Sequence, residues 1–190
     1  MRIDHLTPLT GRMLFAMPSV TERAFQRSAI LVCAHSANGG MGLLVNRPAT
    51  NMTLRRLLRE TGRSVPEVRI GVPVHAGGPA DIDRAFVLHS PDYHLAAHTI
   101  RVTDAIWLTP HDDVIDDLAQ GYGPARSFIA MGYCGWGAGE LEHEVREGCW
   151  LTGAANDDLV FDTPSADRWP RGMERMGIAP SALSFQPGHA

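Results

Sequence analysis

The sequence predicts one α+β domain, in which a mixed, mainly antiparallel β-sheet is flanked by helices. Apolar stretches of strand length, joined by turn residues, dominate the first half of the chain. Helical segments appear between the later strands without the regular alternation that a parallel sheet requires. The 190 residues suffice for one sizeable core, and contents of 44% hydrophobic and 20% charged residues suit a folded chain. We therefore expect a single domain over residues 1–190, with a loosely ordered tail over 178–190.

A hairpin over residues 29–46 is the clearest element of the first half. Residues 29–35 are apolar on both faces, which is typical of a buried central strand, and the turn at 36–40 contains Asn38, Gly39 and Gly40. Residues 41–46 form the returning strand. A short strand over 13–17 precedes the hairpin and ends at Pro18. A helix over 53–61 follows it, because leucines line one face and Thr53 can cap its start.

The second half alternates strands and helices irregularly. We expect strands over 68–75, 84–89, 99–108 and 126–133, with a tight turn at residues 77–79 between the first two. A helix capped by Thr109 ends at Gly121, and another covers 140–147. Short strands follow at 150–151 and 159–161. In the last helix, around Trp169, Pro170 must occupy the first turn or kink the helix.

Charge and cysteine content exclude several classes of protein. The net charge of −4 excludes a globally basic nucleic-acid binder. All 17 basic residues are arginine, so Schiff-base chemistry and a Walker-A phosphate loop, which need lysine, are excluded. Three cysteines without CxxC spacing argue against a disulfide framework or a structural zinc site. With no signal peptide and no apolar run long enough to span a bilayer, we expect a cytoplasmic protein.

Short motifs along nearly the whole chain give it a resemblance to a known family. They are Ala16-Met17-Pro18, Arg27-Ser28, Cys33-Ala34-His35, Met41-Gly42, Asn46-Arg47-Pro48, Gly77-Gly78-Pro79, residues 86–89, residues 132–144, Trp150-Leu151, Asp167-Arg168-Trp169 and Gly188-His189-Ala190. In order and spacing the chain resembles the AlgH/YqgE family of bacterial proteins. The resemblance implies a compact α+β domain and a cytosolic protein. Some members are named as transcriptional regulators of exopolysaccharide production, but the resemblance supplies no defined catalytic residues.

Cys33 and His35 are the candidate catalytic residues. They lie two apart on one predicted strand, so their side chains should share a face. A thiol beside an imidazolium can ionise at a lower pH and act as a nucleophile or a redox sensor. The structural alternative is a buried Cys33 and a His35 that bonds to the turn, and it fits the frequent burial of free cysteine.

Polar residues and glycines at strand ends are the candidate ligand- or partner-binding residues. They are His35, Asn46, Arg47, Gly77, Gly78, His89 and Trp136. His35 belongs at the turn of the 29–46 hairpin and Asn46 at its open end, roughly 16 Å apart at ~3.3 Å per residue. We therefore expect two separate candidate surfaces. Trp136, between glycines, either packs on a turn or stacks on a ligand.

Other motifs have simpler structural interpretations. Cys134 follows a strand in the manner of a nucleophile elbow, but the acidic residues after it would offset the helix dipole. The same acidic residues would repel a phosphate from the glycines at 135, 137 and 139. His94 and His98 lie in a predicted loop, and the aspartates at 112–117 suit a helix start. We expect no metal and no cofactor.

A non-enzymatic regulatory or binding protein, which acts through an unknown protein partner or a small ligand, fits these features best. One alternative is a thiol-dependent redox sensor or enzyme that uses Cys33 with His35. Another is direct DNA binding through the arginines of residues 55–69, namely Arg55, Arg56, Arg59, Arg63 and Arg69. Direct binding is disfavoured, because Glu60 and Glu67 offset that patch and no helix-turn-helix pair is recognisable.

Overall fold

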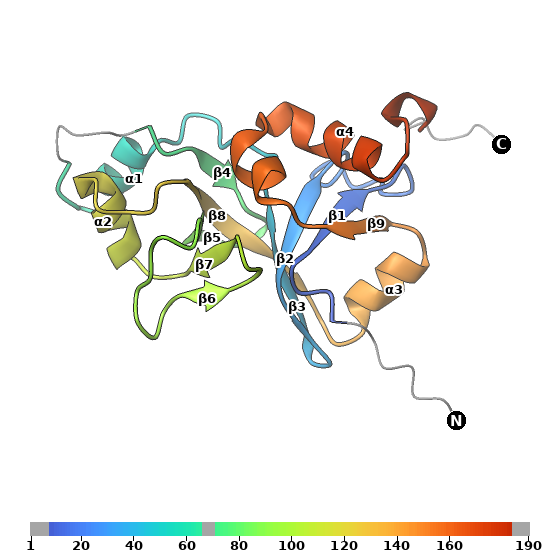
Figure 1. Cartoon of the computed structure of the whole chain (residues 1–190), viewed down its shortest axis with the longest axis horizontal. Helices are drawn as coiled ribbons and strands as arrows, with labels where there is room; N and C mark the ends of the chain where they lie inside the picture. The colour runs from blue at the N-terminus through green and yellow to red at the C-terminus, as the bar shows by residue number, and fades with distance from the viewer. Residues whose placement is uncertain (1–7, 66–70, 184–190) are drawn as a thin grey trace.

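In the computed structural model, which describes residues 8–65 and 71–183, a curled, nine-stranded sheet forms the centre of the fold (Figure 1). The strands are β1 (Arg12–Ala16), β2 (Ala29–Ser36), β3 (Gly39–Leu44), β4 (Val74–Ala76), β5 (Ala80–His89), β6 (Ile100–Arg101), β7 (Trp107–Thr109), β8 (Ser127–Trp136) and β9 (Trp150–Ala154). Their order is β6-β7-β5-β8-β3-β2-β1-β9, with antiparallel neighbours, and β4 pairs in parallel with β8. The predicted α+β class with a mainly antiparallel sheet is confirmed.

Strand β8 joins the two halves of the sheet. Its first part pairs with β4 and β5, whereas its last three residues pair with β3 in the register Gly42↔Cys134 to Gly40↔Trp136. The strand changes direction at Gly132, whose φ of 73° is in the left-handed region that favours glycine. A Cβ there would lie 2.6 Å from the Gly78 carbonyl oxygen, so the chain that enters β5 fits against this bend only because residue 132 lacks a side chain.

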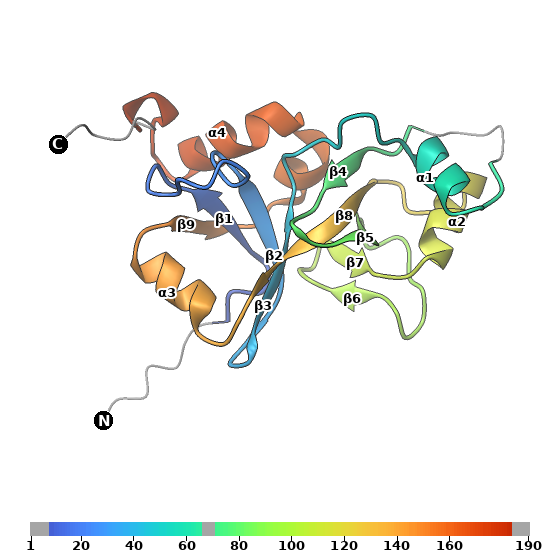
Figure 2. The same ribbon diagram turned by 180° about the vertical axis from the view of Figure 1, so that it is seen from behind.

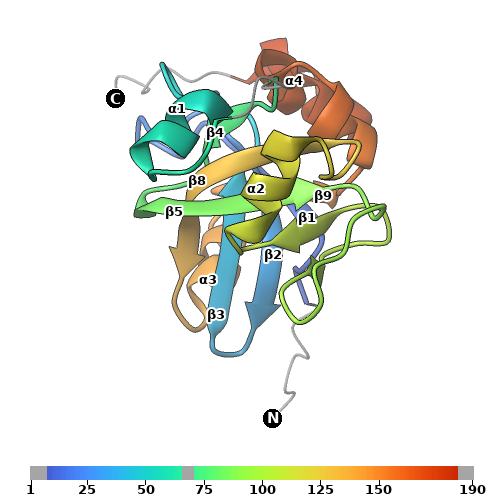
Figure 3. The ribbon, with the colours of Figure 1, turned by 90° about the vertical axis from the view of Figure 1, so that its left-hand side faces the viewer.

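Helices cover different faces of the sheet (Figures 1 and 2). They are α1 (Leu54–Glu60), α2 (Asp113–Gln120), α3 (Glu140–Arg146) and α4 (Ser165–Arg175), with a π-helix at Asp158–Asp162 and a 3-10 turn at Pro180–Ala182. Side chains alternate along β1, so that Met13 and Phe15 join the core beneath α4 while Leu14 and Ala16 join the core on the α3 side. Helices α1 and α2 cover a third core at the other end, nearest the viewer in Figure 3.

Most predicted elements are present, and two differ in kind. Residues 159–161, predicted as a strand, belong to the π-helix, where Leu159 and Val160 fill the core beneath α4. A buried apolar run of three residues reads the same in a sequence whether it is part of a helix or of a strand, so its pattern cannot distinguish the two. The predicted strand at 99–108 is two short strands, β6 and β7, because the chain reverses at residues 102–106 with both Val102 and Thr103 bonded to the Ile106 carbonyl.

Boundaries account for the remaining differences. Of the predicted strand at 68–75, residues 68–70 lie outside the described ranges, and the strand present is the short β4. Helix α2 begins after Asp112, so the predicted cap Thr109 ends β7 instead. Pro170 lies inside α4 and not in its first turn. In the predicted tail, Ile178 and Leu183 pack on the core beneath α4, so residues 178–183 are part of the fold; residues 184–190 lie outside the described ranges. None of the helices in residues 8–65 and 71–183 is long and apolar enough to cross a membrane.

Candidate functional site

Trp136 lies in the wall of a pocket of about 380 Å³, which we call the Trp136 pocket. Three aromatic side chains line it from separate parts of the chain: Phe25 from the loop between β1 and β2, Trp136 from the end of β8, and Trp150 from the start of β9. The rings of Phe25 and Trp150 meet edge to face, with centroids 6.1 Å apart and an interplanar angle of 85°. The pocket therefore exists only in the folded chain.

Glu144 of α3 connects the two tryptophans. The indole N–H of Trp136 donates to Glu144 Oε2 at 2.9 Å, and that of Trp150 donates to the same oxygen at 2.6 Å. Both donors hold the carboxylate in one orientation and leave Oε1 without a hydrogen-bond partner among the described residues. The helix that places Glu144 is anchored by Leu141, which is fully buried on the α3 side of the sheet.

Two more carboxylates, Glu22 and Glu140, line the same pocket. Glu140 accepts the backbone N–H of Gly137 through Oε2 at 2.7 Å, which fixes its position at the start of α3. None of the described lining residues is basic. The pocket therefore combines aromatic walls with three acidic side chains.

Cys134 and Cys149 also line the pocket but are poor nucleophiles. Burial raises the pKa of the Cys134 thiol from 9.0 to about 12, with smaller contributions from Glu144 and Glu22. The pKa of Cys149 is raised by burial and then by Glu144 and Glu147. Cys134 lies within β8 rather than at a helix start, so the elbow interpretation does not hold. Both thiols stay protonated at neutral pH.

Comparisons with known proteins assign the chain to a family. The sequence profile described as AlgH-like matches residues 13–181. A UPF0301 protein of Paracoccus denitrificans is 39% identical over 190 residues, with 99% of this chain and 100% of the relative covered. A UPF0301 protein of Cereibacter sphaeroides is 41% identical over 184 residues, with 96% and 99% covered. The chain belongs to the AlgH-like family.

Solved structures agree with that assignment. The solution structure of the AlgH protein from Pseudomonas aeruginosa matches with a TM-score of 0.80 at 33% identity, over 100% of both chains. A crystal structure from Corynebacterium diphtheriae matches with a TM-score of 0.70 at 19% identity, over 92% of this chain and 90% of that one, and shows the same fold. Much of the Trp136 pocket in this AlgH-like chain is formed by two of the motifs that carry the resemblance, residues 132–144 and Trp150-Leu151.

Cys33 and His35 do not share a face, contrary to the prediction. The register between β2 and β3 shifts between Val32 and Ala34, so Cys33 is an extra residue in a β-bulge and the side-chain alternation changes there. Cys33 is 2% exposed in the core beneath α4. His35 turns toward α3, where Nδ1 accepts the Leu9 N–H at 3.2 Å and Nε2 lies 3.2 Å from Glu142 Oε1.

The Cys33 thiol is expected to be inert in the folded protein. Burial raises its pKa well above the ordinary value, and nearby Cys134 raises it further. Iodoacetamide should therefore leave Cys33 unmodified up to about pH 9 in native buffer and modify it fully in denaturant, as peptide mapping can measure. Cys149, which is only partly buried, is the internal reference for reagent access. Fast native labelling of Cys33 would restore the thiol hypothesis.

Asn46 and Arg47 lie at a second surface, and neither of them lines the Trp136 pocket. Both border a pocket of about 370 Å³ beside α4. Both polar atoms of the Asn46 amide bond within the fold, because Oδ1 accepts the Ala29 N–H and Nδ2 donates to the Arg27 carbonyl, both at 2.8 Å. Arg47 donates to the Gln26 carbonyl. Asn46 therefore fixes the open end of the β2–β3 hairpin.

Gly77 and Gly78 allow two backbone segments to approach closely. A Cβ on Gly77 would lie 2.3 Å from the Gly132 carbonyl oxygen, and one on Gly78 would lie 2.0 Å from the Tyr133 carbonyl carbon. Gly77 also bridges the two halves of the sheet, since its N–H donates to the Met131 carbonyl and its carbonyl accepts the Leu44 N–H. These contacts give both glycines a structural role.

His89 is fully buried and has partners on both ring nitrogens. Nδ1 lies 2.8 Å from the Ser90 carbonyl oxygen, which can only accept, so Nδ1 carries the proton. Nε2 then accepts from the Thr109 hydroxyl at 2.9 Å. Burial lowers the pKa of His89. This arrangement holds β5 to β7 and presents no open ring nitrogen to a ligand.

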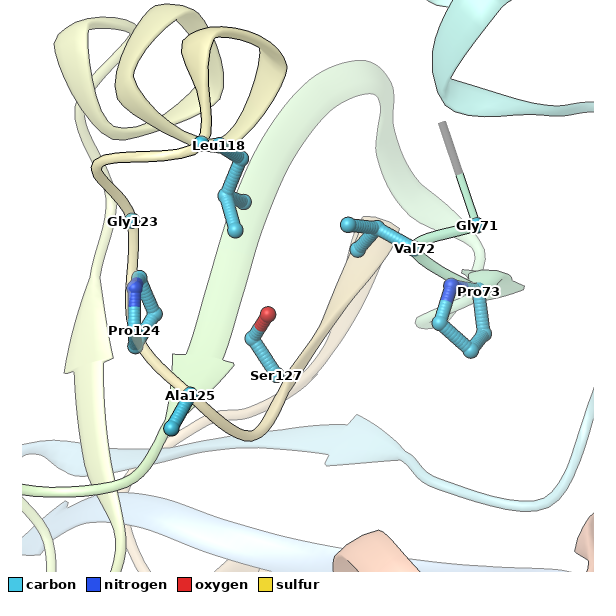
Figure 4. Close-up of a pocket in the computed structure, with 9 residues that line it drawn as sticks. Gly71, Val72, Pro73, Leu118, Gly123, Pro124, Ala125 and Ser127 are labelled. Carbon is cyan, nitrogen blue, oxygen red and sulfur yellow. The ribbon is translucent and has the colours of Figure 1, made fainter. Parts of the chain in front are cut away.

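The other predicted features also form no site. Arg63 pairs with Asp112 at 2.7 Å and with Asp116, and Arg56 pairs with Glu60 at 2.6 Å, so part of the arginine patch is neutralised; Arg69 lies outside the described residues. Across residues 8–65 and 71–183 no group of three or more potential metal ligands comes together. A pocket of about 540 Å³ between α2 and the start of β8 is lined by glycine, proline and small or apolar side chains, with Ser127 as its one described hydroxyl (Figure 4).

The sequence indicated Trp136 but missed its neighbours in the site. Glu144 and Trp150 lie within or beside the motifs that carry the resemblance, yet their six-residue separation has no helix or strand period that would pair them. Phe25 lies in a loop more than 100 residues away in sequence, and nothing local marks it. A pair of tryptophans beside a run of glutamates was the available signal.

Proposed function

We propose that this AlgH-like protein is a cytoplasmic regulatory protein that binds a small ligand or a side chain of a protein partner in the Trp136 pocket. The observation that supports the proposal is the convergence of Phe25, Trp136 and Trp150 on one pocket beside the oriented carboxylate of Glu144. A concave, largely apolar site with a few fixed polar groups is the usual form of a ligand site. The buried thiols and the fully bonded His89 argue for binding without catalysis.

Regulation in this proposal does not need direct contact with DNA. A ligand that orders the loop containing Phe25 against β8 and β9 would change the surface around the pocket. A partner protein could read that change. The arginine patch on α1, in contrast, has part of its charge paired with neighbouring carboxylates.

Ligand screening by NMR tests the proposal. Bound metabolites should shift the indole N–H resonances of Trp136 and Trp150, because both groups lie at the pocket wall. Phe25→Ala should weaken binding roughly tenfold, the effect expected for one aromatic wall. Tyr122→Ala is the matched control, since Tyr122 is 76% exposed and does not line the pocket. Equal binding by Phe25→Ala and wild type, or turnover of a metabolite by the purified protein, would contradict the proposal.

A further inference from the structure

We infer that the ligand of the Trp136 pocket carries a guanidinium group. This inference rests on the proposed function, and it adds the chemical class of the ligand. Aromatic walls, acceptor oxygens and uncompensated negative charge meet in one cavity, and a planar cation with several N–H donors satisfies all three.

The walls suit a cation that stacks. Trp136 and Trp150 are the aromatic residues with the strongest attraction for a cation over the ring face, and guanidinium makes such contacts more often than ammonium does. Phe25 meets Trp150 edge to face, so these two rings stand at a steep angle and not parallel to each other. A planar group in the pocket can therefore lie flat on one ring while its edge faces another.

The carboxylate oxygens of the pocket suit a guanidinium, whose N–H donors point in fixed directions. Glu144 is already oriented by two indole N–H groups on Oε2, and Oε1 is neither bonded nor buried. Glu140 is held in the same way through Oε2 by the Gly137 N–H, and Glu22 has no side-chain hydrogen bond among the described residues. An oriented carboxylate with one open oxygen at a cavity wall favours a charge-assisted hydrogen bond from a guanidinium N–H, and the other N–H groups of the guanidinium can reach a second carboxylate.

The negative charge in the pocket is not balanced by ion pairs within the described part of the chain. Among the ion pairs found in residues 8–65 and 71–183, none includes Glu22, Glu140 or Glu144. The negative charge of Glu144 and Glu22 also acts on Cys134, which lines the same pocket, because both carboxylates help to raise the pKa of its thiol. A ligand of opposite charge would supply the missing compensation.

The three aromatic rings of the pocket, together with its carboxylates, also argue against two other kinds of cation, a metal ion and a quaternary ammonium group. A metal ion would leave the rings without a role, and these carboxylates form no group that could hold one in the described chain. A quaternary ammonium would use the rings but leave the carboxylate oxygens without donors. Guanidinium uses both.

A matched pair of small probes tests the inference. N-acetyl-L-argininamide carries the guanidinium as its only charge, and N-acetyl-L-citrullinamide replaces that group with a neutral urea of nearly the same shape. We expect the arginine probe to quench the fluorescence of Trp136 and Trp150 in a saturable way, and to bind at least roughly tenfold more tightly than the citrulline probe. The preference should weaken as salt is raised.

Carboxylate variants locate the effect. Glu140→Gln keeps an acceptor for the Gly137 N–H but removes the charge, so it should lower affinity for the arginine probe roughly threefold to tenfold and leave the citrulline probe unaffected. Glu174→Gln is the control, because Glu174 is an exposed glutamate of α4 that does not line the pocket. Equal effects of the two variants would overturn the inference.

The source of the guanidinium is distinguished by a third probe. If the group belongs to a protein partner, acetyl-Ala-Arg-Ala-amide should bind more tightly than the single amino-acid probe, and if it belongs to a free metabolite the peptide should bind no better. Equal binding of arginine and citrulline probes would overturn the guanidinium class while leaving a ligand pocket in place. Absence of any arginine-probe binding, together with metabolite shifts at Trp136, would likewise reject the class and retain the proposed function.

Discussion

Replacing Gly78 with alanine should destabilise the protein by about 3 kcal/mol or more, and should prevent folding if the native stability is ordinary. The new Cβ would lie 2.0 Å from the Tyr133 carbonyl carbon and 2.2 Å from its oxygen. Both atoms belong to the backbone of β8, which is held on both sides by β3 and β5, so neither can move away cheaply. Chemical denaturation followed by circular dichroism measures the loss.

A glycine in open space provides the control. A Cβ on Gly71 would meet no atom of the described residues within 4 Å, and its φ is not in the left-handed region, so Gly71→Ala should change the unfolding free energy by no more than about 0.5 kcal/mol. Retention of wild-type stability by Gly78→Ala would mean that β8 and the segment before β5 can separate. The proposed structural role of Gly78 would then be wrong.

Local sequence signals were sufficient for most of the fold. The β2–β3 hairpin was predictable because its turn residues and its doubly apolar strand agree, and α1 was predictable because Thr53 accepts the Arg56 N–H as expected for a cap. The bulge at Cys33 was not predictable. It inserts one residue into a continuous apolar run, and only the pairing with Gly42 and Met41 shows where the register changes.

The candidate site was only partly predictable for a related reason. A position at the end of a strand marked Trp136, Asn46 and His89 alike as candidate binding residues. Whether each side chain is available to a ligand depends on packing with distant parts of the chain, which the local sequence does not show. His89 is enclosed by β7, and the Asn46 amide is used by the backbone of Arg27 and Ala29. Trp136 lines the pocket that also contains the Glu144 carboxylate, whereas Asn46 borders a different pocket with both polar atoms of its amide already bonded.

Beneath α4, two polar residues that were not among the candidate site residues, Arg168 and His75, lie buried beside the core. Arg168 is 5% exposed and donates to the carbonyls of Thr163 and Val45, with its guanidinium over the Phe128 ring at 5.5 Å. His75 is 2% exposed and packs against the same ring in a tilted arrangement, with centroids 4.5 Å apart and an interplanar angle of 51°. Among the described ion pairs none includes Arg168, so its charge acts directly on His75.

Acidification below about pH 6.5 should therefore destabilise the protein through His75. Burial, and then the charge of Arg168, lowers the pKa of His75 from 6.5 to about 4, so the folded state disfavours the protonated ring. His75 takes up a proton near pH 6.5 in the unfolded chain and only near pH 4 in the folded chain. The unfolding free energy is therefore highest above pH 6.5 and falls as the pH is lowered, by about 3 kcal/mol at pH 4. Neutral His75 shares a hydrogen bond between Nε2 and Ser165 Oγ at 3.0 Å, and its buried Nδ1 has no hydrogen-bond partner among the described residues.

Two variants separate His75 from other titrating groups, including His89, whose pKa burial also lowers. His75→Gln keeps an amide that can hydrogen-bond the Ser165 hydroxyl in either direction, but it cannot titrate. The fall in unfolding free energy between pH 7 and pH 4 should therefore be smaller than in wild type by most of that 3 kcal/mol, which corresponds to about two pKa units. Arg168→Met removes the second cause of the shift, and the His75 ring resonances in NMR should then titrate at a higher pH. An unchanged pH slope in His75→Gln, or a wild-type His75 that titrates near pH 6.5, would show that the ring is accessible to solvent and that α4 does not seal this core.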